Sequence, residues 1–254
     1  MTKPILVTGG TGALGREVVR LLLAEGRPVR VMSRRPRPAD DRAAYEWAQC
    51  DLRTGAGAAD AVDGAEVIIH CASTLGRGDE QVTRNLVEAA RQAGNPHLVY
   101  ISIVGIDVIR FFYYNEKLAS EKVVEESGLP WTVLRATQFH DLVAQASSAQ
   151  RRLPVTFMPA GFRFQPVSTA DVAARLVALA SGEPAGRAPD LGGPEVRTAR
   201  DLAEAYQRST GRRTPVVPLW LPGKAFRAFR AGGNLTPENA TGVGTFEEFL
   251  AQRS

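Results

Sequence analysis

Glycine residues near the N-terminus have the spacing of a phosphate-binding loop. Segment 7–15 reads Val-Thr-Gly-Gly-Thr-Gly-Ala-Leu-Gly and follows the apolar run Ile5–Val7, which predicts a buried strand. Apolar residues at helical spacing begin at Leu14, so the glycines join a strand to a helix. In that context Gly12 lets the backbone approach a pyrophosphate, and Gly15 lets the helix pack closely against the strand. The loop therefore predicts a dinucleotide site, with a plain strand–turn–helix corner as the alternative.

The end of the second predicted strand, Val29–Met32, distinguishes between two cofactors. A site for NAD usually has an acidic residue here, which bonds the ribose hydroxyls. This chain has Ser33, Arg34 and Arg35 instead, and arginine pairs with a phosphate in a forked, charge-assisted geometry. The sequence therefore favours NADP(H) over NAD(H). The alternative is that these arginines are solvated surface charges before a proline-rich loop.

Residues after the third and fourth predicted strands extend the cofactor site. Asp51 and Leu52 lie where a side chain can bond the adenine edge, and a turn-forming Asp explains the pair equally well. The small residues Ala72 and Ser73 follow the fourth strand and let a cofactor lie against the backbone. The contacts predicted in this N-terminal part are Gly9, Thr11, Gly12, Ala13, Leu14, Gly15, Ser33, Arg34, Arg35, Asp51, Leu52, Ala72 and Ser73.

Strands and helices that alternate along the chain must position these residues. Strands are predicted at 5–7, 29–32, 45–50, 67–69, 98–103 and 131–134, and helices from Leu14, at 82–93 and at 113–127. Such alternation implies right-handed βαβ units and a parallel sheet covered on both faces. The fold class expected is therefore α/β, a Rossmann-type doubly wound parallel sheet that forms one domain over residues 1–254.

The C-terminal part, residues 150–254, is predicted to contribute a smaller substrate-binding lobe over the carboxyl edge of the sheet. Ser168 and Asp171 open a helix in an arrangement like a capping box. Further helices are expected at 200–209 and 223–230, with the proline-rich stretch 214–222 as a connection.

Composition narrows the class of protein. The net charge is +4, but most arginines are spread out and no nucleic-acid-binding motif occurs. No apolar run approaches the roughly 18 residues of a membrane span, and no signal-peptide pattern is present. The chain is therefore expected to be cytoplasmic, without a nucleic-acid or membrane partner. Cys50 and Cys71 are expected to be buried thiols, no metal site is expected, and His140 is expected at the surface, or else as a polar pocket residue.

The glycine loop, the Asp51-Leu52 pair and the stretch from Tyr113 to Ala119 together resemble the short-chain dehydrogenase/reductase superfamily. The glycine spacing and segment 128–135, Gly-Leu-Pro-Trp-Thr-Val-Leu-Arg, resemble its atypical NmrA-like, NAD(P)-binding branch. The resemblance spans nearly the whole chain. It implies an NAD(P)-binding Rossmann fold much more specifically than it implies a reaction.

The resemblance implies a catalytic Tyr-x-x-x-Lys pair, which Tyr113 and Lys117 match, with Ser102 as the upstream serine. Residues four apart lie on one helix face, and a lysine ammonium beside a phenol favours the phenolate. Tyr113 would then exchange a proton with a substrate oxygen, Lys117 would also bond the nicotinamide ribose, and Ser102 would hold the substrate. The alternative is that Tyr113 belongs to an aromatic helix start that packs on the core or lines a pocket.

By the same resemblance, the segment after the sixth strand would complete the cofactor site. The backbone around Thr137 would contact the nicotinamide carboxamide, and Phe139 would wall the pocket. The predicted function is an NADPH-dependent oxidoreductase that transfers hydride to a small carbonyl, quinone or similar apolar acceptor. The alternatives are a non-catalytic NADP(H)-binding redox sensor of NmrA type and an epimerase or dehydratase. The expected small-molecule partner is an apolar or aromatic substrate. The sequence leaves open whether the chain forms a homo-oligomer or binds a regulatory protein.

Overall fold

The computed structural model describes residues 3–74 and 76–253. Contacts between Cα atoms divide the chain into two compact units. The first unit comprises Met1–Ser102, Phe112–Leu134 and Ala173–Ala188, and the second comprises Ile103–Phe111, Arg135–Val172 and Pro189–Ser254. The chain therefore leaves the first unit and returns to it twice, and residues of the second unit come from before residue 150 as well as after it.

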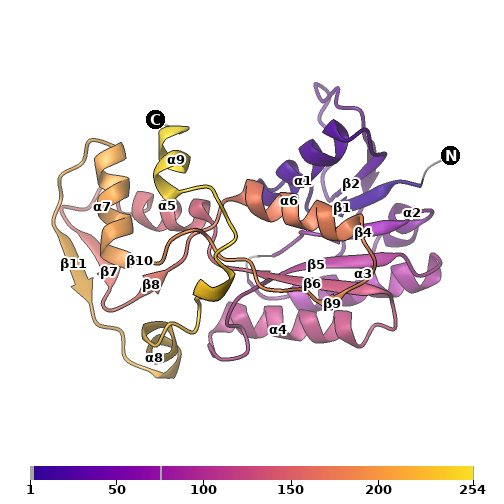
Figure 1. Ribbon diagram of the computed structural model, residues 1–254. Coiled ribbons are helices and arrows are strands. Elements are labelled where there is room, and N and C mark those ends of the chain that lie inside the picture. Colours follow the sequence, from indigo (N-terminus) through magenta and orange to yellow (C-terminus); the bar gives the residue numbers. More distant parts are fainter. Residues whose placement is uncertain (1–2, 75, 254) are drawn as a thin grey trace. The chain divides into compact units, whose positions relative to one another are not determined.

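A seven-stranded sheet forms the centre of the first unit (Figure 1). Its order is β3-β2-β1-β4-β5-β6-β9. The strands are β1 (Ile5–Thr8), β2 (Val29–Ser33), β3 (Glu46–Gln49), β4 (Val67–His70), β5 (His97–Ile103), β6 (Trp131–Ala136) and β9 (Gly186–Arg187). The chain winds outward from β1 in one direction and from β4 in the other, so the order reverses between these two neighbours. β1 pairs with both β2 and β4 in parallel, which confirms the predicted Rossmann-type sheet.

Helices cover both faces of this sheet, as the apolar strands predict. Figure 1 shows α1 (Ala13–Ala24) and α6 (Thr169–Ala180) on one face, and α3 (Asp79–Gln92) and α4 (Phe112–Glu125) on the other. The short helix α2 (Ala58–Val62) follows β3 in the chain. Fully buried side chains of successive strands, such as Leu6, Ile68 and Leu98, pack in one cluster with Leu86 of α3 and Val124 of α4. Because both faces are buried, the strands carry continuous apolar residues rather than alternating ones.

The second unit has a helical cluster and two small sheets. Its elements are α5 (His140–Ser148), β7 (Thr156–Pro159), β8 (Arg163–Phe164), β10 (Arg197–Thr198), α7 (Ala199–Ser209), β11 (Val216–Leu219), α8 (Lys224–Arg230), the 3-10 helix Pro237–Asn239 and α9 (Phe246–Ala251). Apolar side chains of α5, α7 and α9 form a separate core that includes Ala144, Leu202 and Phe246. The expected connection at 214–222 is wrong in part, because it contains β11, which pairs in parallel with β7. Pro218 is tolerated because this small sheet has only two strands.

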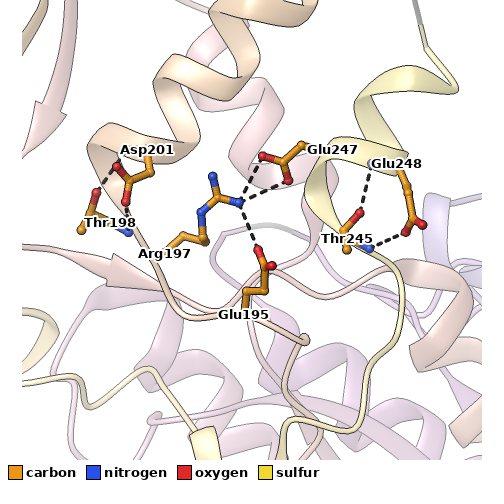
Figure 2. Close-up of polar contacts among 7 residues, drawn as sticks. All are labelled: Glu195, Arg197, Thr198, Asp201, Thr245, Glu247 and Glu248. Carbon is orange, nitrogen blue, oxygen red and sulfur yellow. Dashed lines mark hydrogen bonds and ion pairs between the residues drawn. The ribbon is translucent and has the colours of Figure 1, made fainter.

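Side-chain caps fix where α7 and α9 begin (Figure 2). Thr198 caps α7 in a capping box with Asp201, and Thr245 caps α9 in the same way with Glu248. Arg197 lies between these helix starts and pairs with Glu195 and Glu247, each at 3.1 Å. Both carboxylates are about half exposed, so the ion pairs add little stability compared with the caps.

Two details of the second unit differ from the sequence-based expectations. The Ser168 hydroxyl accepts a hydrogen bond from the Asp171 N–H at 3.0 Å, as in a capping box. The Asp171 carboxylate, however, accepts the N–H groups of Val243 and Gly244, and so holds the segment before α9. His140 is not a surface residue: it is 1% exposed, and its ring lies 5.3 Å from that of Phe249. Among the described residues, no helix is long and apolar enough to cross a membrane.

Candidate functional site

The loops after β1 and β4 meet where the strand order reverses, which is where ligands bind in open α/β sheets. Gly9 directly follows β1 and has φ of +66°, a conformation that favours glycine. A Cβ atom on Gly9 would lie 2.8 Å from both the Cα and the N of Ala72, which follows β4. Gly9 is therefore required twice, for its backbone conformation and for the close approach of the two loops.

The rest of the glycine loop leaves its apex open to a ligand. A Cβ atom on Gly15 would lie 2.2 Å from the carbonyl oxygen of Gly9, so helix α1 packs directly on the loop. Gly12 is the N-cap of α1 and provides no side-chain cap for the helix N–H groups. Thr11, Gly12 and Ala13 are exposed, whereas Leu14 is buried. Uncapped N–H groups at an exposed helix start fit the pyrophosphate of a dinucleotide.

The arginines within and directly after β2 differ in their contacts. Arg30 pairs with Glu46 at 2.7 Å and also donates to the carbonyls of Ala61 and Asp63. Arg34 and Arg35 are exposed, and no ion pair of either occurs among the described residues.

The backbone that carries these two arginines is nevertheless fixed. The Ser33 hydroxyl accepts the Arg35 N–H at 3.2 Å, and the Trp47 indole donates to the Arg35 carbonyl at 3.1 Å. Two guanidinium groups on a held turn fit a phosphate ligand.

The Asp51-Leu52 pair lies in a turn that the structure satisfies internally. The Asp51 carboxylate accepts the Arg53 N–H at 3.0 Å, which is the bond of a turn-forming Asp. Leu52 is buried, and its carbonyl accepts the Asn85 side-chain amide at 2.7 Å. These contacts favour the turn alternative for Asp51, while its contact with adenine stays a prediction.

A buried histidine, which the sequence analysis did not single out, ties β1 to β4. The Thr83 hydroxyl donates its hydrogen to the Asp79 carbonyl at 2.9 Å, so it accepts from Nε2 of His70, 3.3 Å away. Nδ1 of the neutral His70 then accepts the Thr8 hydroxyl at 2.6 Å, while Thr8 also accepts the Ala72 N–H at 3.2 Å. Burial lowers the pKa of His70 to about 3, and the nearby Lys117 adds to the shift. This neutral histidine holds together the strand ends that carry the glycine loop and Ala72.

Lys117 lies buried on α4, inside the first unit. It is 3% exposed, its ammonium donates to the Ile101 carbonyl at 2.9 Å, and it lies 4.2 Å from the centre of the Tyr100 ring. Burial lowers the pKa of this ammonium, and the neighbouring Tyr113 opposes the shift. Tyr113 is thus close enough for its charge to affect the Lys117 ammonium, and the catalytic role of the pair stays a prediction.

The Tyr113 hydroxyl contacts Ser73, whereas the role predicted for Ser102 is to hold the substrate. The Tyr113 hydroxyl lies 3.1 Å from the Ser73 hydroxyl, in the loop after β4. Ser102 is 3% exposed, and its hydroxyl has no hydrogen-bond partner among the described residues. Most buried hydroxyls in proteins have a hydrogen-bond partner, so an unpaired one calls for an explanation, such as a catalytic role or a bound water or ion. Ser102 is thus an orphaned polar group on β5, one residue from the Ile101 carbonyl that holds Lys117.

Asp79 anchors the loop that presents Ser73. It is 2% exposed, and its carboxylate accepts the Ser73 hydroxyl at 2.8 Å and the Thr74 N–H at 2.6 Å. The same loop contacts α4 at a second point, where the Glu116 carboxylate accepts the Gly78 N–H at 2.9 Å. The sequence analysis missed Asp79, although an aspartate after Gly78 at a helix start is a local signal for a loop anchor.

Thr137 and Phe139 belong to the second unit and are described within it. Thr137 is buried, and its N–H donates to the Leu191 carbonyl at 3.0 Å. Its hydroxyl donates to the Gln165 carbonyl and accepts the Gly193 N–H. Phe139 is half-buried at the N-cap of α5. The predicted contacts of these two residues with the nicotinamide stay predictions.

Comparisons with known proteins agree with this geometry. A family model described as NAD(P)H-binding matches residues 9–183, which include the glycine loop, Tyr113 and Lys117. The chain belongs to this NAD(P)H-binding family. The prediction of an NADP(H)-binding chain is confirmed at the level of the family, which binds NAD(P)H.

Named relatives indicate the general activity. The chain is 32% identical over 213 residues to a (4-alkanoyl-5-oxo-2,5-dihydrofuran-3-yl)methyl phosphate reductase of Streptomyces griseus, covering 82% of this chain and 74% of the relative. It is 28% identical to an NAD(P)H azoreductase of Xenophilus azovorans, covering 85% and 77%. By its family and these relatives the chain is an NAD(P)H-dependent oxidoreductase.

A solved structure confirms the fold. The NADPH-dependent quinone oxidoreductase of Escherichia coli, solved with NADPH, matches with a TM-score of 0.83, covering 98% of this chain and 99% of the other. The identity is 22%, so this likeness concerns the fold alone. The NAD(P)H-binding family is shown by the family model, while the short-chain dehydrogenase/reductase superfamily and its NmrA-like branch stay predictions.

Proposed function

We propose that this protein is an NADPH-dependent reductase of small carbonyl, quinone or similar apolar acceptors, with Tyr113 as the proton donor. One observation carries the proposal: an unbroken series of contacts runs from the glycine loop to Tyr113. Gly9 packs on Ala72, Ser73 follows Ala72, and the Ser73 hydroxyl lies 3.1 Å from that of Tyr113. These contacts support a site in which a dinucleotide held on the glycine loop would reach Tyr113, the acid that a reductase needs.

The residues present fit the chemistry of a carbonyl reduction. When bound, the dinucleotide supplies a hydride to the acceptor carbon. The Tyr113 hydroxyl gives its proton to the acceptor oxygen, so the carbonyl becomes an alcohol and Tyr113 becomes a phenolate. The Lys117 ammonium, 2.9 Å from the Ile101 carbonyl, stabilises that phenolate by its charge. The Ser102 hydroxyl, which has no partner among the described residues, would hold the acceptor oxygen.

The proposal also covers the choice of cofactor, the residues that bind substrate and the cellular compartment. Arg34 and Arg35 would bind the 2′-phosphate and so select NADPH. Residues 150–254 would contribute to substrate binding as a lobe of a single domain. Cys50 and Cys71 are free thiols, and their reduced state fits a cytoplasmic protein. The reductase relatives favour this reading over a non-catalytic sensor.

Steady-state oxidation of NADPH against a panel of quinones, aldehydes and azo dyes tests the proposal. Tyr113→Phe should lower kcat about 100-fold or more, because general acid catalysis contributes roughly that factor. Lys117→Met keeps the length of the buried side chain and should lower kcat while the protein stays folded. Glu116→Gln, one residue away on α4, is the matched control and should keep its activity. Tight NADPH binding without turnover of any acceptor, or full activity of Tyr113→Phe, would refute the proposal.

A further inference from the structure

The turn that carries Arg34 and Arg35 begins where the backbone pairing of β2 and β3 ends. The last pair of the parallel register is Ser33 with Gln49, and among the described residues no backbone N–H donates to the carbonyl of either arginine. Two side chains of β3 supply donors instead. The Gln49 amide donates to the Arg34 carbonyl at 3.4 Å, and the Trp47 indole N–H donates to the Arg35 carbonyl at 3.1 Å. Both bonds tie the turn to the edge strand of the sheet.

Trp47 is itself held by the segment that follows the turn. Side chains two residues apart on a strand point to the same face, so Trp47 and Gln49 lie on one face of β3. The Trp47 indole stacks with the Tyr45 ring, and the ring centres are 6.2 Å apart. The Arg37 guanidinium lies 4.9 Å from the centre of the Tyr45 ring and pairs with Asp41 at 3.6 Å. The segment between the turn and β3 therefore packs on the indole that bonds the turn.

The contacts fix the backbone of Arg34 and Arg35 and leave their charged groups exposed. Arg37 differs from them, because its guanidinium also donates to the Ala43 carbonyl at 2.5 Å and so belongs to the segment itself. Arg34 and Arg35 have no ion pair among the described residues. Their backbone is bonded at both carbonyls and, through the Ser33 hydroxyl, at the Arg35 N–H. A guanidinium on a fixed backbone loses less conformational entropy when it binds a phosphate than one on a mobile turn.

We propose that Trp47 and Gln49 are positioning residues for the choice of cofactor, which hold the turn so that Arg34 and Arg35 can both bind the 2′-phosphate of NADPH. The inference rests on the proposed function, in which these arginines bind that phosphate. Two forked guanidinium groups bind one phosphate best when the backbone that carries them is already ordered. NADH lacks the 2′-phosphate, so a loosened turn lowers the affinity for NADPH alone.

Trp47→Phe removes the indole N–H and keeps an aromatic ring beside Tyr45. The dissociation constant of NADPH should rise about fivefold, because one hydrogen bond that orders the turn contributes on that order. The dissociation constant of NADH should stay unchanged. Trp220→Phe is the matched control, since Trp220 stacks with the Arg230 guanidinium at 4.1 Å and its indole N–H has no hydrogen-bond partner among the described residues. This variant should bind both cofactors as the natural protein does.

Gln49→Met tests the second bond with a side chain of similar length that has no donor. The bond from Gln49 to the Arg34 carbonyl is the longer of the two, so the dissociation constant of NADPH should rise only about twofold. Gln49 is exposed on the edge strand, so this variant should fold even where Trp47→Phe does not. In that case Gln49→Met decides the question by the same criteria.

Isothermal titration calorimetry with NADPH and with NADH measures these dissociation constants on the full-length proteins, independently of turnover. Each variant is also combined with Arg34→Ala and Arg35→Ala. In that background Trp47→Phe and Gln49→Met should change NADPH binding by less than about 1.5-fold, because the groups through which they act are absent. A loss that is confined to NADPH, and to proteins that keep both arginines, supports the inference.

Three results refute the inference: an unchanged NADPH affinity in Trp47→Phe, an equal loss of affinity for NADH, or the same loss in the background without the arginines. Each would mean that Trp47 does not act through Arg34 and Arg35. If Arg34→Ala with Arg35→Ala alone leaves NADPH binding unchanged, it is the proposed choice of cofactor that fails.

Discussion

Replacing Gly9 by alanine tests the claim that the loops after β1 and β4 require glycine for their close approach. Two costs add at this position. An alanine with φ of +66° costs roughly 1–2 kcal/mol in the left-handed conformation. Its Cβ atom would also lie 2.8 Å from the Ala72 backbone and 2.9 Å from the Cys71 carbonyl carbon, and such overpacking costs about 1–3 kcal/mol. We expect Gly9→Ala to lower the free energy of unfolding by about 2–5 kcal/mol.

Gly26 provides a matched control for the packing cost. Its φ of +69° is nearly the same, but a Cβ atom there would meet nothing within 4 Å. Gly26→Ala should therefore cost only the roughly 1–2 kcal/mol of the backbone conformation. Effects of alanine on the unfolded chain are the same in both variants and cancel in the comparison. The difference between the two variants isolates the approach of the two loops.

Urea unfolding at pH 7.5 measures the free energies, and fluorescence titration with NADPH measures affinity. Gly9→Ala should unfold at a lower urea concentration than Gly26→Ala, with the difference corresponding to about 1–3 kcal/mol. Its NADPH affinity should fall at least about tenfold, a change of about 1.4 kcal/mol, while Gly26→Ala binds NADPH normally. Equal destabilisation by the two substitutions would refute the argument from packing.

Two further predictions concern pH and cofactor choice. The pKa of His70 is about 3 in the folded protein, below the unfolded value of about 6.5. The free energy of unfolding that the neutral histidine supports is therefore fully present above pH 6.5 and is lost as the pH falls. At pH 5 the loss should be about 2 kcal/mol. Urea unfolding at pH 7.5 and pH 5.0 should show this dependence in the natural protein and a weaker one in His70→Gln, and an equal dependence in both would contradict the assignment. Replacing Arg34 and Arg35 together by alanine should weaken NADPH binding about tenfold or more and leave NADH binding unchanged. Fluorescence titration with each cofactor measures both affinities. An equal loss of affinity for the two cofactors would mean that these arginines do not contact the 2′-phosphate.

The sequence predicts the local parts of the site best. The glycine loop is recognisable because a strand, a turn and a helix start follow one another within about ten residues, so that local chemistry determines the geometry. The pair Tyr113 and Lys117 is recognisable for the same reason, since four residues span one helical turn. β11 was missed because Pro218 is typical of a connection, and only pairing with β7 makes the stretch a strand.

Contacts between residues far apart in the chain could not be predicted from the sequence. His70 depends on Thr8, which is 62 residues away, and Tyr113 bonds Ser73 across 40 residues. No periodicity connects such partners, because the order of the strands in the sheet brings them together. Ser102 was chosen by resemblance to a family pattern, whereas Ser73 belongs to a loop whose place is set by Asp79. His140 was expected at the surface because a single histidine does not show that Phe246 and Phe249 pack against it.

The aromatic residues at the start of α4 have different surroundings. This difference helps to distinguish the two hypotheses for Tyr113, a catalytic acid or a packing residue. Tyr114 is 7% exposed and belongs to the buried face of α4 with Lys117, three residues further along the helix. Phe112 is 45% exposed and lies on the other side of α4 from Tyr114. Its ring stacks with the Arg77 guanidinium. Tyr113 lies between these positions, half-buried, with its hydroxyl on Ser73. Because Tyr114 occupies the buried position and the Tyr113 hydroxyl faces Ser73, this arrangement favours the proposed acid over the packing alternative.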